Sequence, residues 1–123
     1  MKIIDITARI TAIVLLCLGT IHCAFTPVII KNIPGDIRSV FLYMFLSTGL
    51  AFLYLGTVML IEIRRFRRKV TDSLLILNIS MGLALAAGIM AVFTMPENPF
   101  AWITFATVLP SSVIIFGKQL VRK

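Results

Sequence analysis

His22 is the one histidine of the chain, and it lies within a long stretch that has no charged residue. An imidazole titrates near neutral pH, ligates metals and hydrogen bonds to carbonyl groups. Because an ionisable side chain is costly inside a membrane span, its presence in one raises the hypothesis of a functional site. The favoured interpretation is structural: a neutral ring bonded to a backbone carbonyl, such as the one that Pro27 leaves without its usual donor.

Chemistry that needs several convergent side chains finds little support in the sequence. A bis-histidine haem needs a second histidine, and Cys23 points about 100° away from His22 on a helix, so we predict no metal site. The sequence lacks Gly-x-Ser-x-Gly, His-Glu-x-x-His and glycine-rich phosphate-loop motifs. No cofactor is predicted, and a quinone stays open as a ligand because His22 can donate to a quinone carbonyl.

Four charge-free runs must position these side chains. The residues are 59% hydrophobic, against about 45 to 50% apolar in soluble domains. About 20 apolar residues cross a hydrocarbon layer of about 30 Å as a helix, and each run meets that length. The runs are Ile10 to Ile30, Ser39 to Ile61, Ser73 to Pro96 and Asn98 to Gly117. We therefore expect membrane spans at about 10–30, 39–61, 73–95 and 99–117.

The connections between the runs are short and carry turn-forming residues. Pro34-Gly35 lies between the first two runs, and Pro96 and Pro99 flank the turn between the last two. Short connections make neighbouring helices antiparallel. The sequence thus predicts an all-α fold, an integral membrane up-down-up-down four-helix bundle, with residues 1–123 as a single transmembrane domain.

The distribution of the basic residues predicts the orientation of this bundle. Only Lys31 and Arg38 fall on the side of the two proline-containing turns. The Lys/Arg bias of short loops sets the orientation of spans, so we expect a multi-pass protein of the cell (inner) membrane with cytoplasmic N- and C-termini. The ten basic residues on the other side are Lys2, Arg9, Arg64, Arg65, Arg67, Arg68, Lys69, Lys118, Arg122 and Lys123.

Polar residues recur at helical spacing within the spans, and such stripes are expected to meet inside the bundle because lipid offers no hydrogen-bond partners. In the second span the stripe contains Tyr43, Ser47, Tyr54 and Thr57. Depth along the helices then sorts the polar side chains into two layers. The outer layer is a candidate ligand site of His22, Thr26, Tyr43, Ser47, Thr104 and Thr107. The inner polar cluster contains Tyr54, Asn78 and Ser111.

Small residues in the third span predict a close helix contact. Gly82-x-x-x-Ala86 and Ala84-x-x-x-Gly88 are pairs that let another backbone approach. Packing inside the bundle is the favoured interpretation, and a homodimer face or a place in a larger membrane complex is the alternative.

The densest charge run, residues 64–69, predicts contact with the membrane surface. Its basic residues are Arg64, Arg65, Arg67, Arg68 and Lys69. Such a run beside a cytoplasmic interface binds anionic lipid head groups, and it also serves as a topology anchor. Nucleic acid is not an expected partner, because the loop has no fold to present the charges.

Two families resemble parts of this chain. The first span resembles the first helix of DoxX-like small membrane proteins. The resemblance rests on Arg9, on Leu18-Gly19-Thr20-Ile21-His22 and on Phe25-Thr26-Pro27 before a Lys31-Asn32 turn. That resemblance covers about the first quarter of the chain and implies a four-helix bundle, in some cases associated with quinone-linked redox complexes. The chain also resembles small multidrug exporters in length and span count, but it lacks their carboxylate in the first span.

These observations favour a non-catalytic protein, either an accessory subunit or a binder of a hydrophobic small molecule in the outer polar layer. The rival hypothesis is a component of a quinone-linked redox membrane enzyme that uses His22 and Tyr43. A small proton-coupled transporter is the third hypothesis, with His22 in place of the missing carboxylate as proton carrier.

Overall fold

The computed structural model describes residues 2–70 and 73–120, and the side chains of residues up to 117 within that range. The described chain forms four helices joined by short turns: α1 (Lys2–Ile30), α2 (Gly35–Arg67), α3 (Ser73–Thr94) and α4 (Pro99–Leu120). All four are long and apolar enough to cross a membrane. The prediction of an all-α chain with four apolar helices is therefore confirmed.

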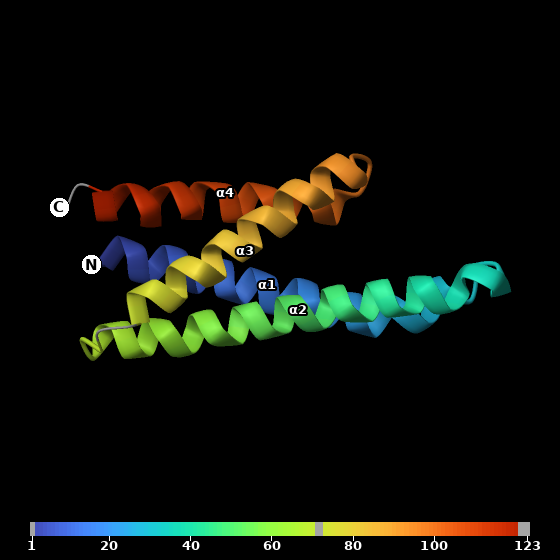
Figure 1. The fold of residues 1–123 in the computed structure, drawn as a ribbon, viewed down its shortest axis with the longest axis horizontal. Coiled ribbons are helices and arrows are strands. Elements are labelled where there is room, and N and C mark those ends of the chain that lie inside the picture. The colour runs from blue at the N-terminus through green and yellow to red at the C-terminus, as the bar shows by residue number, and fades with distance from the viewer. Residues whose placement is uncertain (1, 71–72, 121–123) are drawn as a thin grey trace.

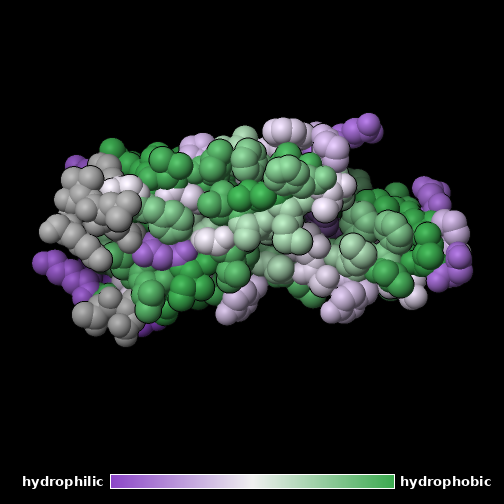
Figure 2. Space-filling view, turned by 45° about the horizontal axis from the view of Figure 1, so that its top comes forward, coloured by the Kyte–Doolittle hydropathy of each residue, from purple (hydrophilic) through white to green (hydrophobic). Residues whose placement is uncertain are grey.

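Each helix packs against two others (Figure 1). Helix α1 contacts α2 and α4, and α3 contacts the same two helices from the other side. Helix α3 runs obliquely across the other helices in this view. Figure 2 shows a surface that is mostly apolar, with hydrophilic residues gathered towards its ends. Arg122 and Lys123, two of the basic residues used above for orientation, lie outside the described residues, as does the side chain of Lys118.

The first two helices are longer than the charge-free runs from which they were predicted. Helix α1 begins at Lys2 and α2 continues to Arg67, because ion pairs allow charged turns to remain helical. Asp5 pairs with Arg9 one turn later at 3.1 Å, and Glu62 pairs with Arg65 at 2.9 Å. A charge therefore ends an apolar run without ending the helix.

The backbones of α1 and α2 approach each other closely at their glycines. A Cβ built on Gly19 would lie 2.7 Å from the carbonyl oxygen of Gly49, and one on Gly56 would lie 2.8 Å from the carbonyl oxygen of Ala12. Both distances are too short for any side chain, so glycine is required where these two helices cross. The small-residue pairs had predicted such a contact for the third span, and these glycines add one between the first two.

In α3 the two small-residue pairs have different surroundings. Ala84 and Gly88 are buried, and a Cβ on Gly88 would be 3.4 Å from Cα of Phe105 on α4. Gly82 has nothing within 4 Å of a built Cβ. The pair Ala84 and Gly88 thus packs inside the bundle, as favoured above, whereas Gly82 lies on an open face.

The α1–α2 pair extends past the α3–α4 turn (Figure 1). A hydrogen bond of 2.7 Å from Thr11 to Ser111 places these two residues at one level. From Ser111 to Pro99 is about 18 Å of helix, whereas from Thr11 to Ile30 is about 28 Å, at about 1.5 Å per residue. Helix α1 therefore continues about 10 Å beyond the start of α4, and this difference in length creates a step.

Candidate ligand cavity at His22

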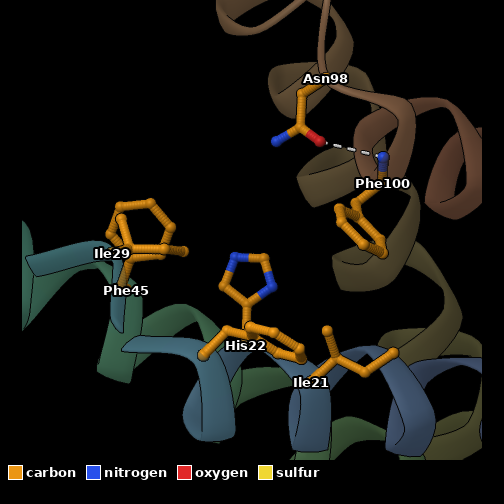
Figure 3. Close-up of a pocket in the computed structure, with 7 residues that line it drawn as sticks. Ile21, His22, Ile29, Phe45, Asn98 and Phe100 are labelled. Carbon is orange, nitrogen blue, oxygen red and sulfur yellow. Dashed lines mark hydrogen bonds between the residues drawn. The ribbon is translucent and has the colours of Figure 1, made fainter. Parts of the chain in front are cut away.

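A cavity of about 330 Å³ lies at this step. It opens where α4 begins, so that one wall comes from α1 and α2 and the other from the start of α4 (Figure 3). His22 and Asn98 are its polar lining residues among those described, and the rest of the lining is apolar. The lining consists of Ile21, His22, Phe25, Ile29, Phe45, Asn98 and Phe100.

Aromatic rings of α2 hold His22 in place. The imidazole stacks on Phe45 with ring centroids 5.6 Å apart, and it meets the edge of Phe52 at 6.1 Å. Figure 3 shows the ring standing up from α1 into the space below Asn98. Within the described part of the chain no residue forms a hydrogen bond with the ring, so its nitrogen atoms are available to a ligand or to water.

Asn98 reaches the same cavity from the start of α4. Its Oδ1 accepts a hydrogen bond of 3.0 Å from the backbone N–H of Phe100, the arrangement of a helix N-cap with Pro99 in the first turn. The side chain of Trp102 donates to the carbonyl of Pro96 at 2.7 Å and closes the turn. The two prolines had predicted only a turn here, although Asn followed by Pro at a helix start is a recognisable cap signal.

A second, smaller space of about 30 Å³ also adjoins His22. His22, Asn98 and Phe100 line both spaces. Thr104 lines the smaller one with its hydroxyl bonded to the carbonyl of Phe100 at 2.8 Å. Its full lining is Leu18, His22, Thr48, Phe52, Ala91, Met95, Asn98, Phe100, Ala101 and Thr104.

The structure brings together only part of the outer polar layer predicted from the sequence. Thr26 is buried beside His22 and donates to the backbone carbonyl of His22 at 2.6 Å. Thr104 lines the smaller space, as described above. Thr26, Ser47 and Thr107 line neither space. The hydroxyls of Ser47 and Thr107 donate to the backbone carbonyls of Met44 and Ile103 in their own helices.

The prediction that the polar stripe of the second span faces inwards is wrong. Tyr43 is 75% exposed and Tyr54 is 69% exposed, and Ser47 and Thr57 are exposed as well. Helix α2 instead turns its glycine face, with Gly49 and Gly56, towards α1. The stripe lies roughly 135° away from that face at 100° per residue. Its Thr57 needs no partner from another helix, because the hydroxyl bonds to the carbonyl of Leu53 at 2.8 Å.

The inner polar cluster is also rearranged. Ser111 is buried and accepts its hydrogen bond from Thr11 of α1, while its own hydroxyl donates to the carbonyl of Thr107 at 2.7 Å. Tyr54 lies on the outer surface of α2, away from this bond, and Asn78 is half-buried on α3. The structure thus joins Ser111 to α1 rather than to Tyr54.

At the opposite end of the molecule, two of the five basic residues of the charge run are engaged within the protein. Arg67 bonds to Asp5 and Arg65 to Glu62. Arg64, Arg68 and Lys69 are exposed and form no ion pair with a described residue. Among the described residues, no group of three His, Cys, Asp or Glu side chains is placed to hold a metal ion.

Comparisons of the chain with protein-family models, with curated proteins and with solved structures found no match.

Proposed function

We propose that the protein binds a hydrophobic small molecule in the cavity at His22, as a non-catalytic binding protein or an accessory subunit of the inner membrane. In this proposal the four helices span the bilayer up-down-up-down, and both termini face the cytoplasm. The four apolar helices support membrane insertion, and the ten-to-two distribution of basic residues supports the orientation. The resemblance of the first helix to DoxX-like proteins agrees with such a bundle.

The observation that carries the proposal is the cavity itself. Its volume of about 330 Å³ falls in the range of small-molecule sites, about 300 to 1,000 Å³, and such sites combine apolar walls with a few polar groups. The cavity at His22 has this composition, with aromatic and aliphatic walls and two polar side chains. We place the anionic lipid contact at the other end of α2, where Arg64, Arg68 and Lys69 are not engaged in ion pairs with described residues.

The test is to identify what the purified protein carries and to block the cavity. Ile21→Trp adds bulk to the cavity wall, whereas Ile79→Trp makes the same change at an exposed position of α3. The apolar extract of each purified variant is compared with that of the parent by mass spectrometry. The proposal requires a stoichiometric molecule in the parent and the Ile79→Trp variant that is lost from Ile21→Trp. If all three extracts contain only bulk phospholipid, the proposal fails.

A component of a quinone-linked redox enzyme remains the second candidate, because two hydrogen-bond donors in an apolar cavity suit a quinone carbonyl. Tyr43 has no part in it, since its side chain is exposed on α2 and does not line the cavity. A bound quinone that is reduced and reoxidised with the protein present would favour this candidate. The transporter hypothesis has less support, because no described lining residue is a carboxylate.

A further inference from the structure

The cavity offers a defined set of hydrogen-bonding groups. Oδ1 of Asn98 is already bonded to the N–H of Phe100, so the amide nitrogen is the polar atom that Asn98 presents on its other side. Its contact with the sulfur of Met95, at 3.9 Å, occupies at most one of its two hydrogens and is weak. A neutral imidazole at His22 adds one donor and one acceptor. Donors therefore outnumber acceptors in the described lining.

Charge excludes two classes of ligand. No described lining residue carries a carboxylate or a fixed positive charge. Glu97 lies in the adjoining turn and does not line the cavity; it lines an open hollow with Thr94, Met95 and Pro96 that shares Asn98 with the cavity. Because a buried charge without a partner is costly, neither an ammonium nor a carboxylate head would be balanced in the cavity. The head group that fits is uncharged and accepts hydrogen bonds.

The apolar lining gives the ligand a direction. Ile21, Phe25 and Ile29 are spaced four residues apart and form one stripe along α1. The stripe starts beside His22 and continues outwards for about 10 Å, at about 1.5 Å per residue, past the start of α4. Phe25 and Ile29 are exposed along this overhang. An apolar tail can lie there while the head stays beside Asn98.

We propose that the cavity takes an uncharged amphiphile with a carbonyl-bearing head, whose oxygen accepts hydrogen bonds from the Asn98 amide and the His22 imidazole. The apolar tail runs outwards along Ile21, Phe25 and Ile29. This inference rests on the proposed function, because it names the class of molecule that occupies the same cavity.

Three probes with one tail and different heads test the inference. Decylubiquinone has a neutral head with carbonyl oxygens, decylbenzene has none, and decyltrimethylammonium is cationic. Binding to the full chain in lipid nanodiscs is measured by titration calorimetry, with empty nanodiscs subtracted. The parent protein should bind decylubiquinone about tenfold more tightly than decylbenzene, as expected for one or two hydrogen bonds. It should bind the cationic probe most weakly.

Two variants separate the head contacts from the fold. Asn98→Asp keeps an oxygen for the cap of α4 but replaces the donor with a negative charge. It should weaken decylubiquinone binding about tenfold, leave decylbenzene unchanged and improve binding of the cation. His22→Phe keeps a ring beside Phe45 but removes both nitrogens, and it should weaken decylubiquinone severalfold. Asn32→Asp makes the matched change in the turn before α2, outside the lining, and should have no effect.

The outcomes distinguish the two proposals. If Asn98→Asp and His22→Phe bind all probes as the parent does, while Ile21→Trp abolishes binding, the cavity holds apolar molecules without recognising a carbonyl head. The further inference is then wrong and the proposed function stands. If the parent binds none of the probes, or Ile21→Trp binds them all equally well, the cavity is not a binding site and both proposals are wrong. Thermal unfolding of each variant tests whether the fold is retained. Asn98→Ser is included as a second change that keeps a cap oxygen for α4 but removes the amide.

Discussion

Arg67 donates two hydrogen bonds to the carboxylate of Asp5, at 3.0 Å and 2.6 Å, and so joins the end of α2 to the first turns of α1. The carboxylate is mostly buried, whereas the guanidinium is more than half exposed. The two residues are 62 positions apart in the chain, so this pair stabilises the tertiary fold rather than a single helix.

Arg67→Met should lower the free energy of unfolding by about 1 to 2 kcal/mol, because it leaves a largely buried carboxylate with Arg9 as its remaining described partner. Solvent around the guanidinium keeps the effect below that of a fully buried pair. Unfolding of the detergent-solubilised protein by denaturant, followed by circular dichroism, measures the change. Arg68→Met removes a nearby charge that has no such partner and serves as the control. Equal losses in both variants would show that the pair contributes nothing specific.

Two glycines should respond in opposite ways to alanine. Gly56→Ala places a Cβ 2.8 Å from the carbonyl oxygen of Ala12, so α1 and α2 must separate and stability falls. Gly82→Ala meets nothing within 4 Å and gains up to about 1 kcal/mol of helix propensity. Melting temperatures of the two variants, measured in one detergent, should move apart. A stabilised Gly56→Ala protein would contradict the close packing of the two helices.

Replacing Lys69 by glycine should stabilise the protein. It follows α2 with φ 58°, in the left-handed region, and the N–H groups of Lys69 and Val70 close the helix onto Phe66 and Arg65. A residue other than glycine costs roughly 1 kcal/mol there, so Lys69→Gly should raise the free energy of unfolding by about that amount. Arg68→Gly, at φ −83°, should not stabilise the protein. Equal effects of the two changes would argue against the left-handed turn.

Reporter fusions test the proposed orientation. A reporter that is active only in the cytoplasm should give signal when fused after Lys123 and none when inserted near Gly35, because the predicted topology assigns ten of the twelve basic residues to the side of the termini. A reporter active only outside the cytoplasm should give the opposite pattern. Signal from the cytoplasmic reporter at Gly35 would show that the proposed orientation is wrong and that the turns on this side face the cytoplasm.

The four helices could be predicted because length and lack of charge are sufficient criteria for an apolar span. The side that each helix presents could not be predicted as well. Polar side chains were expected to face the interior of the bundle. The hydroxyls of Ser47 and Thr57, however, donate to backbone carbonyls of their own helix, so these residues do not need partners in the interior. The face of α2 that packs against α1 carries Gly49 and Gly56. The prediction used the positions of the polar residues and did not consider these glycines.

The lining of the candidate cavity and of the smaller space could be predicted only in part. His22 was singled out because an ionisable residue in an apolar span is conspicuous, and Thr104, predicted in the same layer, lines the smaller space with it. Asn98 was missed because its position depends on where α4 begins relative to α1, a relation that no single helix encodes. The aromatic wall at Phe45 and Phe100 was missed for the same reason.

The step between the two hairpins means that they match bilayers of different thickness. A hydrocarbon layer thick enough to cover α1 as far as Ile30 would bring acyl chains to the level of Glu97, which is exposed in the turn between α3 and α4. A layer that ends at Glu97 would leave the apolar side chains of Phe25 and Val28 in water. Embedded in a membrane, the protein would therefore have to tilt, or to thin the bilayer locally on the side of α3 and α4, in the leaflet that the proposed orientation makes the outer one. Its conformation and its occupancy should both depend on the length of the surrounding acyl chains.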